Sequence, residues 1–240
     1  MKLIIKLLLI LGLGICIIYA FKSEEKTNIL SHTVDLKKQN LKLYWKNDKG
    51  EILKSFKNLN NHIKSKKETL VFAMNGGMYM KNRTSLGLFI ENGVTKKKIN
   101  KVKEAFGNFY MQPNGIFYIT DSNQGFVCQT DSFVNKNIKY ATQSGPMLVI
   151  DGKMHPKVKK GSKNLNNRNG VGIIPNNKLV FAMSKEKINF YNFATYFKSL
   201  GCKNALYLDG YVSRTYLPKK GFNYLGGNFG VIIGETKKSK

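Results

Sequence analysis

The chain has 240 residues, of which 42% are hydrophobic, and it carries a formal net charge of +26. This length and apolar content are enough to bury a full core, which excludes a disordered chain and a small domain that depends on disulfides. The 40 cationic residues comprise 3 Arg and 37 Lys, spread along the whole chain. A nucleic-acid surface would show basic clusters interleaved with aromatic residues. No such cluster is found in the sequence, so no specific nucleic-acid partner is expected.

The first 21 residues are typical of a signal anchor or a signal peptide. Lys2 and Lys6 precede an uncharged apolar run over residues 7–21, and residues 22–30 form a polar linker. Counted from Leu3, the run is long enough to span a bilayer, while Ile18-Tyr19-Ala20 is a poor cleavage site. An uncleaved anchor is therefore favoured. Either reading predicts a domain outside the cytoplasm, in a bacterial periplasm or cell envelope. Lipidation at Cys16 is the less favoured alternative.

The remaining cysteines and histidines do not indicate a metal site. Cys128 and Cys202 can form one disulfide or remain two buried thiols, and both alternatives stay open. The three histidines are not spaced as ligand pairs, and each is expected at the surface or in a turn. No cofactor is expected.

The first part of the domain, which we expect over residues 31–236, is predicted to contain a hairpin, a helix and a central strand. Alternating segments at residues 41–45 and 52–56 flank a turn at residues 47–50. A helix is expected over residues 59–66. The apolar run at residues 69–74 is suited to a buried strand, and it ends in Asn75-Gly76-Gly77.

Further strands and one clear helix follow. Strands are predicted at residues 86–90, 112–119, 125–128, 147–150 and 178–183, with turns at residues 91–93, 151–152 and 176–177. Apolar residues recur at i, i+3, i+4 and i+7 from Phe190 to Phe197, which predicts a helix with Asn189 as its N-cap and Gly201 beyond its end. A last strand is predicted at residues 229–233 and a basic tail at residues 237–240.

One carboxylate stands out because an apolar strand delivers it into a glycine turn. The strand predicted over residues 205–208 is followed by Asp209 and Gly210. A carboxylate at such a junction is desolvated unless a partner pairs with it. The alternative is that Asp209 only caps the turn. Two further polar clusters favour the functional interpretation.

Asn75, Gly76 and Gly77 form the first of these clusters, where glycines permit a positive φ or let backbone amides face a ligand. Gln143, Ser144 and Gly145 form the second, at the start of a predicted strand. No Gly-x-Ser-x-Gly motif surrounds Ser144, so a hydrogen-bonding or structural serine is favoured over a nucleophile.

The three arginines lie close to glycine-containing clusters. They are Arg83, Arg168 and Arg214. Only a guanidinium forms two parallel hydrogen bonds with a carboxylate or phosphate, so in a chain that otherwise uses Lys these positions point to a geometric requirement.

Taken in order, the clusters resemble the motifs of the phosphodiester glycosidase family, which includes the lysosomal uncovering enzyme. The resemblance covers residue 69 to the C-terminus and rests on residues 75–79, 143–149, 168–172 and 205–210. The Gln-Pro-Asn-Gly at residues 112–115 and the Asp-Gly-x-x-Ser-Arg at residues 209–214 are similar to the bacterial envelope branch. Tyr211 and Val212 depart from the uncovering enzyme, which has further glycines there, and this departure puts the substrate in doubt.

The resemblance implies a mixed α/β (α+β) fold, with a twisted, largely antiparallel sheet and a few flanking helices. It also implies an exported hydrolase of a glycosyl phosphodiester or a related envelope glycan bond. Cleavage at an anomeric carbon needs a carboxylate and neutralisation of the departing phosphate. Asp209 is the predicted base, nucleophile or electrostatic stabiliser, and Arg168 and Arg214 are predicted to neutralise phosphate.

The remaining site residues are predicted to orient the substrate. Ser144 is placed with the catalytic group, and the predicted binding residues are Asn75, Gly76, Gly77, Asn114, Gln143, Gly145, Asn169, Gly210, Ser213 and Arg214. Asn75, Ser144, Arg168, Asp209 and Arg214 are expected to converge in one cleft. Glu91, Asp151 and Glu186 are candidates for a second acid. The alternatives to an enzyme are an envelope module that binds anionic glycan and a structural envelope protein.

Overall fold

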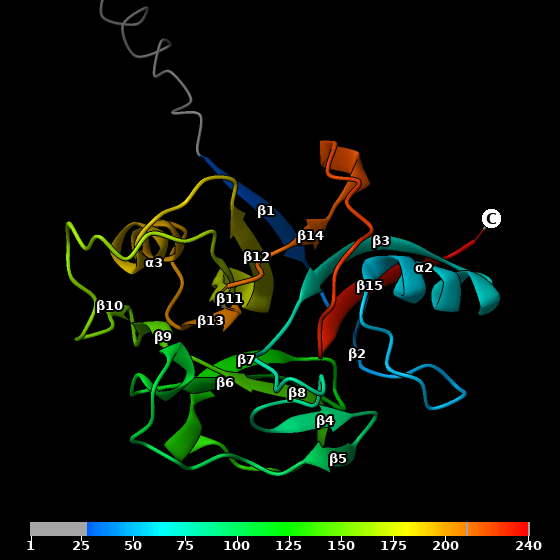
Figure 1. Ribbon diagram of the computed structural model, residues 1–240, viewed down its shortest axis with the longest axis horizontal. Coiled ribbons are helices and arrows are strands. Elements are labelled where there is room, and N and C mark those ends of the chain that lie inside the picture. The colour runs from blue at the N-terminus through cyan, green and yellow to red at the C-terminus, as the bar shows by residue number, and fades with distance from the viewer. Residues whose placement is uncertain (1–27, 210, 240) are drawn as a thin grey trace, which may run out of the picture.

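The computed structural model describes residues 28–209 and 211–239, and in these residues three antiparallel sheets pack around a common core (Figure 1). The predicted signal or anchor segment and most of the linker lie outside the described residues. Within the described part of the chain every strand pairing is antiparallel. The chain is thus a mixed α+β protein dominated by antiparallel sheet.

The six-stranded sheet carries the end of the strand that holds Asp209. Its strands in spatial order are β1 (Ile29–Val34), β12 (Lys178–Ser184), β11 (Asn169–Ile174), β13 (Ala205–Asp209), β9 (Met147–Ile150) and β10 (Lys153–Met154). The hairpin between β11 and β12 turns at Asn176 and Asn177, both with positive φ, as the sequence predicts.

The other two sheets complete the core. One contains β14 (Thr215–Tyr216), β3 (Glu68–Asn75), β15 (Ile232–Lys238) and β2 (Asn40–Tyr44). The other contains β5 (Val94–Lys97), β4 (Phe89–Glu91), β8 (Ile138–Ser144), β6 (Gly115–Thr120) and β7 (Gly125–Gln129). Apolar residues of all three sheets share one buried cluster, in which the ring of Phe181 contacts both Phe72 and Phe117. Their ring contacts tie the three sheets together.

Two α-helices lie among the described residues. Helix α3 (Phe190–Ser199) begins at Asn189, whose side chain accepts from the backbone N–H of Asn192, and Gly201 follows it with a positive φ, as predicted. Its aromatic stripe packs on β13 and β9. A Cβ at Gly170 or Gly172 would lie within 3.3 Å of this stripe, so both glycines are needed for close helix packing. The short 3-10 helices are η1 (Asn108–Tyr110), η2 (Thr130–Ser132), η3 (Pro175–Asn177) and η4 (Pro218–Lys220).

Sequence predictions for a strand, a helix and the last strand differ from the structure. The strand predicted at residues 52–56 is reduced to a single bridge between Ile52 and Lys46. Ser55 accepts from the backbone N–H of Asn58 and so starts helix α2 (Phe56–Ser65) three residues earlier than predicted. The last strand is also displaced, because β15 runs through Lys237 and Lys238, which pair with Thr69 and Glu68. Residues assigned to a basic tail therefore belong to the sheet.

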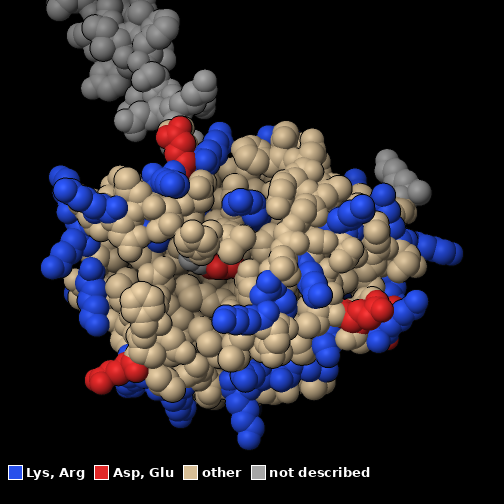
Figure 2. Space-filling view, in the orientation of Figure 1, with Lys and Arg blue, Asp and Glu red and all other residues tan. Residues whose placement is uncertain are grey.

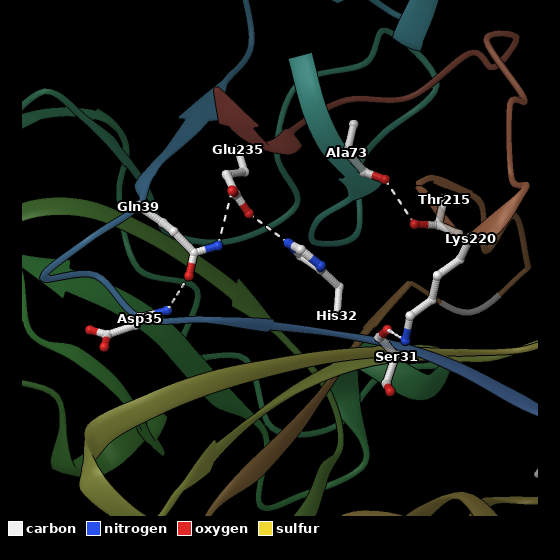
Figure 3. Close-up of polar contacts among 8 residues, drawn as sticks. All are labelled: Ser31, His32, Asp35, Gln39, Ala73, Thr215, Lys220 and Glu235. Carbon is white, nitrogen blue, oxygen red and sulfur yellow. Dashed lines mark hydrogen bonds and ion pairs between the residues drawn. The ribbon is translucent and has the colours of Figure 1, made fainter. Parts of the chain in front are cut away.

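A partly buried hydrogen bond between His32 and Glu235 joins two of the sheets (Figure 3). His32 on β1 lies 2.5 Å from Oε2 of Glu235 on β15, and Gln39 donates to Oε1 of the same carboxylate at 2.9 Å. Burial alone would raise the pKa of Glu235, but the hydrogen bonds from His32 and Gln39 lower it below its ordinary value of 4.5. His32, predicted at the surface, is instead part of this junction between sheets.

The described residues also include Cys128, Cys202 and His155, and they were tested for a membrane-spanning helix. Cys128 and Cys202 are both free thiols, and burial raises their pKa values to about 11 and about 12. His155, predicted at the surface or in a turn, is buried and begins a turn in which its carbonyl accepts from the backbone N–H of Val158. Within residues 28–209 and 211–239, no helix has the length and apolar character needed to cross a membrane.

Candidate active site

Strand ends from all three sheets meet at Asp209. Asp209 is the last residue of β13, and it lies opposite Asn169, the first residue of β11. Asn75 ends β3 and Ser144 ends β8. Because each strand is anchored by a buried apolar run, the polar residues at their ends are held in fixed positions.

Two buried asparagines hold the carboxylate. Asn75 donates from Nδ2 to Oδ2 of Asp209 at 2.5 Å. Asn169 donates from its own Nδ2 to the carbonyl and the Oδ1 of Asn75, and its Oδ1 accepts from the backbone N–H of Asp209 at 2.9 Å. Asn75, Asn169 and Asp209 are therefore one closed hydrogen-bonded set, in which neutral amides position a carboxylate inside the fold.

The segment after Asp209 folds back onto the same set. Ser213 donates to the carbonyl of Asp209 at 2.9 Å, and the backbone N–H of Arg214 donates to Oδ1 of Asn75 at 2.8 Å. The Arg214 side chain donates to the carbonyl of Ser213 and lies over the ring of Tyr224. Asn75 is thus the central residue, because it contacts Asp209, Asn169 and Arg214 at once. Gly210 lies outside the described residues.

A cavity of about 380 Å³ opens beside Asp209. It is lined by Met78, Tyr79, Leu86, Asn108, Asn166, Asp209, Tyr211 and Val212. Figure 2 shows a hollow near the middle of this face with acidic atoms inside it and Lys or Arg side chains on the surface around it. Tyr211 stands at the mouth and is 91% exposed. The cavity is large enough for a small sugar, and Tyr79, Asn108, Asn166 and Asp209 place polar groups on a wall that is otherwise largely apolar.

Ser144 and its neighbours hold the backbone of the site. Ser144 donates to the carbonyl of Leu208 at 2.7 Å, which fixes the residue before Asp209. Gln143 bonds the backbone of Leu88 and Asn100, and Asn114 donates to the carbonyl of Phe109. A Cβ at Gly145 would lie 2.6 Å from Cβ of Asn114. These contacts agree with the structural serine favoured by the sequence, and none of these four residues lines the cavity.

The two glycines after Asn75 are needed for packing. Gly77 has a φ of +96°, and a Cβ there would lie 2.2 Å from Oγ1 of Thr142 on β8. A Cβ at Gly76 would lie 2.4 Å from Ile233. The Gly76 N–H donates to the carbonyl of Val231, so this amide is directed into the sheet and not toward a ligand.

Arg168 lies beneath the site and is fully buried. Its guanidinium donates to the carbonyl of Ile188, to Asn164 and to the hydroxyl of Tyr207, and it stacks on Phe190 at 3.6 Å from the ring centroid. These contacts tie the loop before β11 to β13 and helix α3. Contact between Arg168 and phosphate stays a prediction, since Arg168 is not among the residues that line the cavity.

Sequence reasoning missed three polar residues of the cavity wall, which are Tyr79, Asn108 and Asn166. Burial and the negative charge of Asp209 both raise the pKa of Tyr79, so its phenol is protonated at neutral pH. Tyr79 stands in the motif at residues 75–79, which was the available signal. Asn108 and Asn166 lie in loops whose folding no local pattern predicts.

The three candidates for a second acid lie elsewhere. Glu91 accepts from the backbone N–H of Trp45, Glu186 accepts from Asn28, and Asp151 occupies the turn between β9 and β10. None of them lines the Asp209 cavity. Among the residues described, no group of three His, Cys, Asp or Glu side chains is arranged to hold a metal ion.

This combination of an antiparallel α+β fold and a buried carboxylate at the meeting of strand ends agrees with a glycosidase class of protein. The family model for phosphodiester glycosidase matches residues 68–230, and the chain belongs to this family. It is 36% identical over 197 residues to the uncharacterized protein YigE of Escherichia coli strain K12, a match that covers 81% of this chain and 76% of YigE.

Solved structures share the fold at low sequence identity. The catalytic domain of zebrafish N-acetylglucosamine-1-phosphodiester alpha-N-acetylglucosaminidase, auto-inhibited by its pro-peptide, has a TM-score of 0.56 at 12% identity and covers 89% of this chain and 85% of its own. An exported protein from Burkholderia pseudomallei has a TM-score of 0.56 at 8% identity, covering 86% of this chain and 73% of its own. A hypothetical protein from Synechocystis has a TM-score of 0.51 at 12% identity, covering 87% and 59%.

Proposed function

We propose that this protein hydrolyses a glycosyl phosphodiester, with Asp209 as the catalytic carboxylate. The observation that carries the proposal is the position of Asp209, which Asn75 and Asn169 hold at the floor of a sugar-sized cavity. Family membership supports the class of reaction. The zebrafish structure is described as an enzyme for an N-acetylglucosamine-1-phosphodiester, so an α-linked N-acetylglucosamine is the first sugar to test.

The reaction replaces the bond between the anomeric carbon and the phosphate oxygen with a bond to water. Charge of oxocarbenium type develops on the sugar, and a carboxylate close to the anomeric carbon stabilises it. Asp209 supplies that carboxylate and can act as base toward water or as nucleophile. The hydrogen bond from Asn75 orients it, and the surrounding buried strands keep it from turning away.

The departing group is a phosphate monoester, which is a weak base and needs no strong acid to leave. Tyr79 is the one phenol on the cavity wall beside Asp209 whose pKa the Asp209 charge raises, so it can donate a hydrogen bond to the departing phosphate oxygen or to a sugar hydroxyl. Arg214 is the guanidinium proposed to neutralise the phosphate, because its side chain is exposed and its backbone N–H is bound to Asn75, next to Asp209, although Arg214 itself does not line the cavity. Arg168 supports the loop that carries Asn166 and Asn169.

We also propose that the domain works outside the cytoplasm. The support is the Lys2, Lys6 and apolar 7–21 pattern of the N-terminus, which predicts a membrane anchor. A substrate in the cell envelope would then be within reach of a tethered enzyme.

The test is hydrolysis of the methyl diester of α-N-acetylglucosamine 1-phosphate by the full chain in detergent. Asp209→Asn is expected to lower kcat at least 10³-fold, since it removes the charge while it keeps the side-chain size. Asp131→Asn, which neutralises an exposed carboxylate paired with Lys103, is the matched control and should keep full activity. Equal turnover by wild type and Asp209→Asn would exclude the role of Asp209.

A second measurement separates the alternatives. Calorimetric binding of the same diester without turnover in the wild type would favour a glycan-binding module. If the diester is neither bound nor hydrolysed, the result would favour a structural envelope protein.

A further inference from the structure

A second and larger cavity, of about 640 Å³, lies away from Asp209 between two of the sheets. We call it the Trp45 groove. Its walls come from β2 and the loop after it, from the end of helix α2 and the start of β3, and from the turn between β4 and β5 with Tyr140 of β8. It shares no lining residue with the Asp209 cavity.

The floor of the Trp45 groove holds buried polar atoms with hydrogen-bonding capacity that the chain does not fully use. Tyr44 is only 8% exposed, and its hydroxyl interacts with the Thr236 side chain without forming a hydrogen bond of regular geometry. Oε2 of Glu68 is buried and has no hydrogen-bond partner. A buried polar atom without a full set of hydrogen bonds costs free energy. A ligand that supplies hydrogen-bonding groups to these atoms would therefore be stabilised in the groove. Both can accept hydrogen bonds from hydroxyl groups, and the Tyr44 hydroxyl can also donate one.

The rim of the groove is basic and contains the one tryptophan of the chain. Lys42, Lys46 and Lys96 lie on it, and the Lys46 ammonium is 4.4 Å from the centroid of the Trp45 ring. Glu91 lies deeper, where burial raises the pKa of its carboxyl. A ligand that fits has hydroxyl groups for the floor and negative charge for the rim, which is the chemistry of a sugar phosphate.

Arg83 connects this groove with the Asp209 cavity. Its backbone carbonyl accepts from Nε1 of Trp45 at 3.0 Å, and its guanidinium lies 5.3 Å from the ring centroid of Tyr79, which lines the Asp209 cavity. The sequence singled out Arg83 with the other two arginines, and the proposed reaction gives it no role. Its guanidinium also donates to Oδ1 of Asn228 and to the carbonyl of Lys81, each at 2.7 Å, which holds it in place beside Tyr79.

We infer that the Trp45 groove is a second glycan subsite, which binds a further sugar-phosphate unit of a polymeric substrate whose scissile bond lies at Asp209. The nature of the repeating unit rests on the proposed function. The protein then acts on a chain of sugars joined by phosphodiesters, and Arg83 contacts the phosphate between the two subsites.

Trp45 reports occupancy of the groove directly, because it is the one tryptophan in the sequence. The experiment titrates full-length Asp209→Asn protein in detergent with phosphodiester-linked N-acetylglucosamine oligomers of one and four units, and follows Trp45 fluorescence. The tetramer is expected to change the fluorescence and to bind at least tenfold more tightly than the single unit. An unchanged signal, or equal affinity for both lengths, would overturn the inference.

Substitutions on the groove floor and at Arg83 show which residues bind the tetramer. Tyr44→Phe and Glu68→Gln, each added to Asp209→Asn, should weaken tetramer binding about three- to tenfold, the value of a hydrogen bond to a ligand, and leave the single unit unaffected. Arg83→Gln should weaken the tetramer alone. Tyr118→Phe, which alters a half-buried tyrosine on β6 that does not line the groove, is the control. Tyr44→Phe should keep the wild-type Tm, because its hydroxyl has no regular partner to lose.

Two further outcomes are decisive. A neutral tetramer of N-acetylglucosamine without phosphate should bind at least tenfold more weakly, and equal binding would overturn the sugar-phosphate assignment. The proposed function fails separately, if wild type hydrolyses neither oligomer. A length-dependent Trp45 response in that case would still support the groove as a glycan subsite.

Discussion

Two carboxylates in this protein are equally buried and are held in different ways. Asp209 and Glu235 are each 6% exposed. Glu235 has one oxygen bound by His32 and the other by Gln39, so the chain itself takes up both. Asp209 is held by the neutral side-chain amide of Asn75, and its side chain forms part of a cavity wall.

This difference shows that burial of a carboxylate does not identify a catalytic group. A side chain that serves stability has its charge matched by a cationic or amide partner inside the fold. A side chain that serves chemistry is oriented by neutral donors while it keeps a face toward ligand space. Substitutions that separate activity from stability therefore test the assignment of each.

After Asp209→Asn, the largest effect is expected from Asn75→Ala. This change removes the donor to Asp209 and the acceptor for Arg214 N–H and Asn169, so it should lower kcat by about 10³-fold. The free energy of unfolding should fall by about 2–3 kcal/mol, because buried donors lose their partner. Diester hydrolysis and urea unfolding are the measurements.

Asn40→Ala is the matched control for Asn75→Ala. Asn40 donates its side-chain amide to Thr236 at the partly exposed edge of β2, and its loss should change neither quantity much. If Asn75→Ala kept near-wild-type kcat, the amide set would be structural alone, and Asp209 would not differ from Glu235 in kind.

Much of the fold could be predicted from the sequence, because strong apolar runs and turn residues fixed the elements locally. Helix α3 is an example, with its phenylalanine stripe and Asn189 cap. The strand expected at residues 52–56 does not form as predicted. Its short alternating pattern is interrupted at Ser55, whose side chain caps helix α2 by accepting from the backbone N–H of Asn58. The last strand was misplaced because its pairing partner, β3, is far away in sequence and supplies the register.

The candidate site was predictable in part for the same reason. Asp209 and Asn75 each end an apolar strand, and a glycine follows each of them in the sequence. Their side chains meet as predicted. Arg168 was expected to face phosphate, yet its guanidinium is satisfied by Ile188, Asn164 and Tyr207 within the fold. The sequence gives no direction for a side chain, so a buried arginine and a ligand-binding one look alike. Tyr79 stands in the motif at residues 75–79, but the motif alone does not show that the fold brings Tyr79 beside Asp209.

A smaller effect is expected from Tyr79→Phe, which keeps the ring and removes the hydroxyl. If the phenol donates to the departing phosphate oxygen, kcat should fall about 10²-fold with little change in KM, at the lower end for general acid catalysis. The Tm of Tyr79→Phe should equal that of the wild type. A variant with full kcat would show that Tyr79 only shapes the cavity, and a change confined to KM would assign it to sugar binding.

The smallest effect on activity is expected at Glu235, where Glu235→Gln should leave kcat unchanged and lower the free energy of unfolding by about 1.5 kcal/mol at pH 7, the value of a hydrogen bond to a charged group. The folded state lowers the pKa of Glu235 below 4.5, so its stabilisation is present above that pH and is lost as the pH falls through the lowered value. Urea unfolding of wild type and variant should therefore differ at pH 7 and converge toward pH 3. A difference that persisted at pH 3 would show that the His32 contact does not depend on the charge of Glu235. A loss of kcat with retained stability would reverse the comparison and assign a catalytic role to the junction between the sheets.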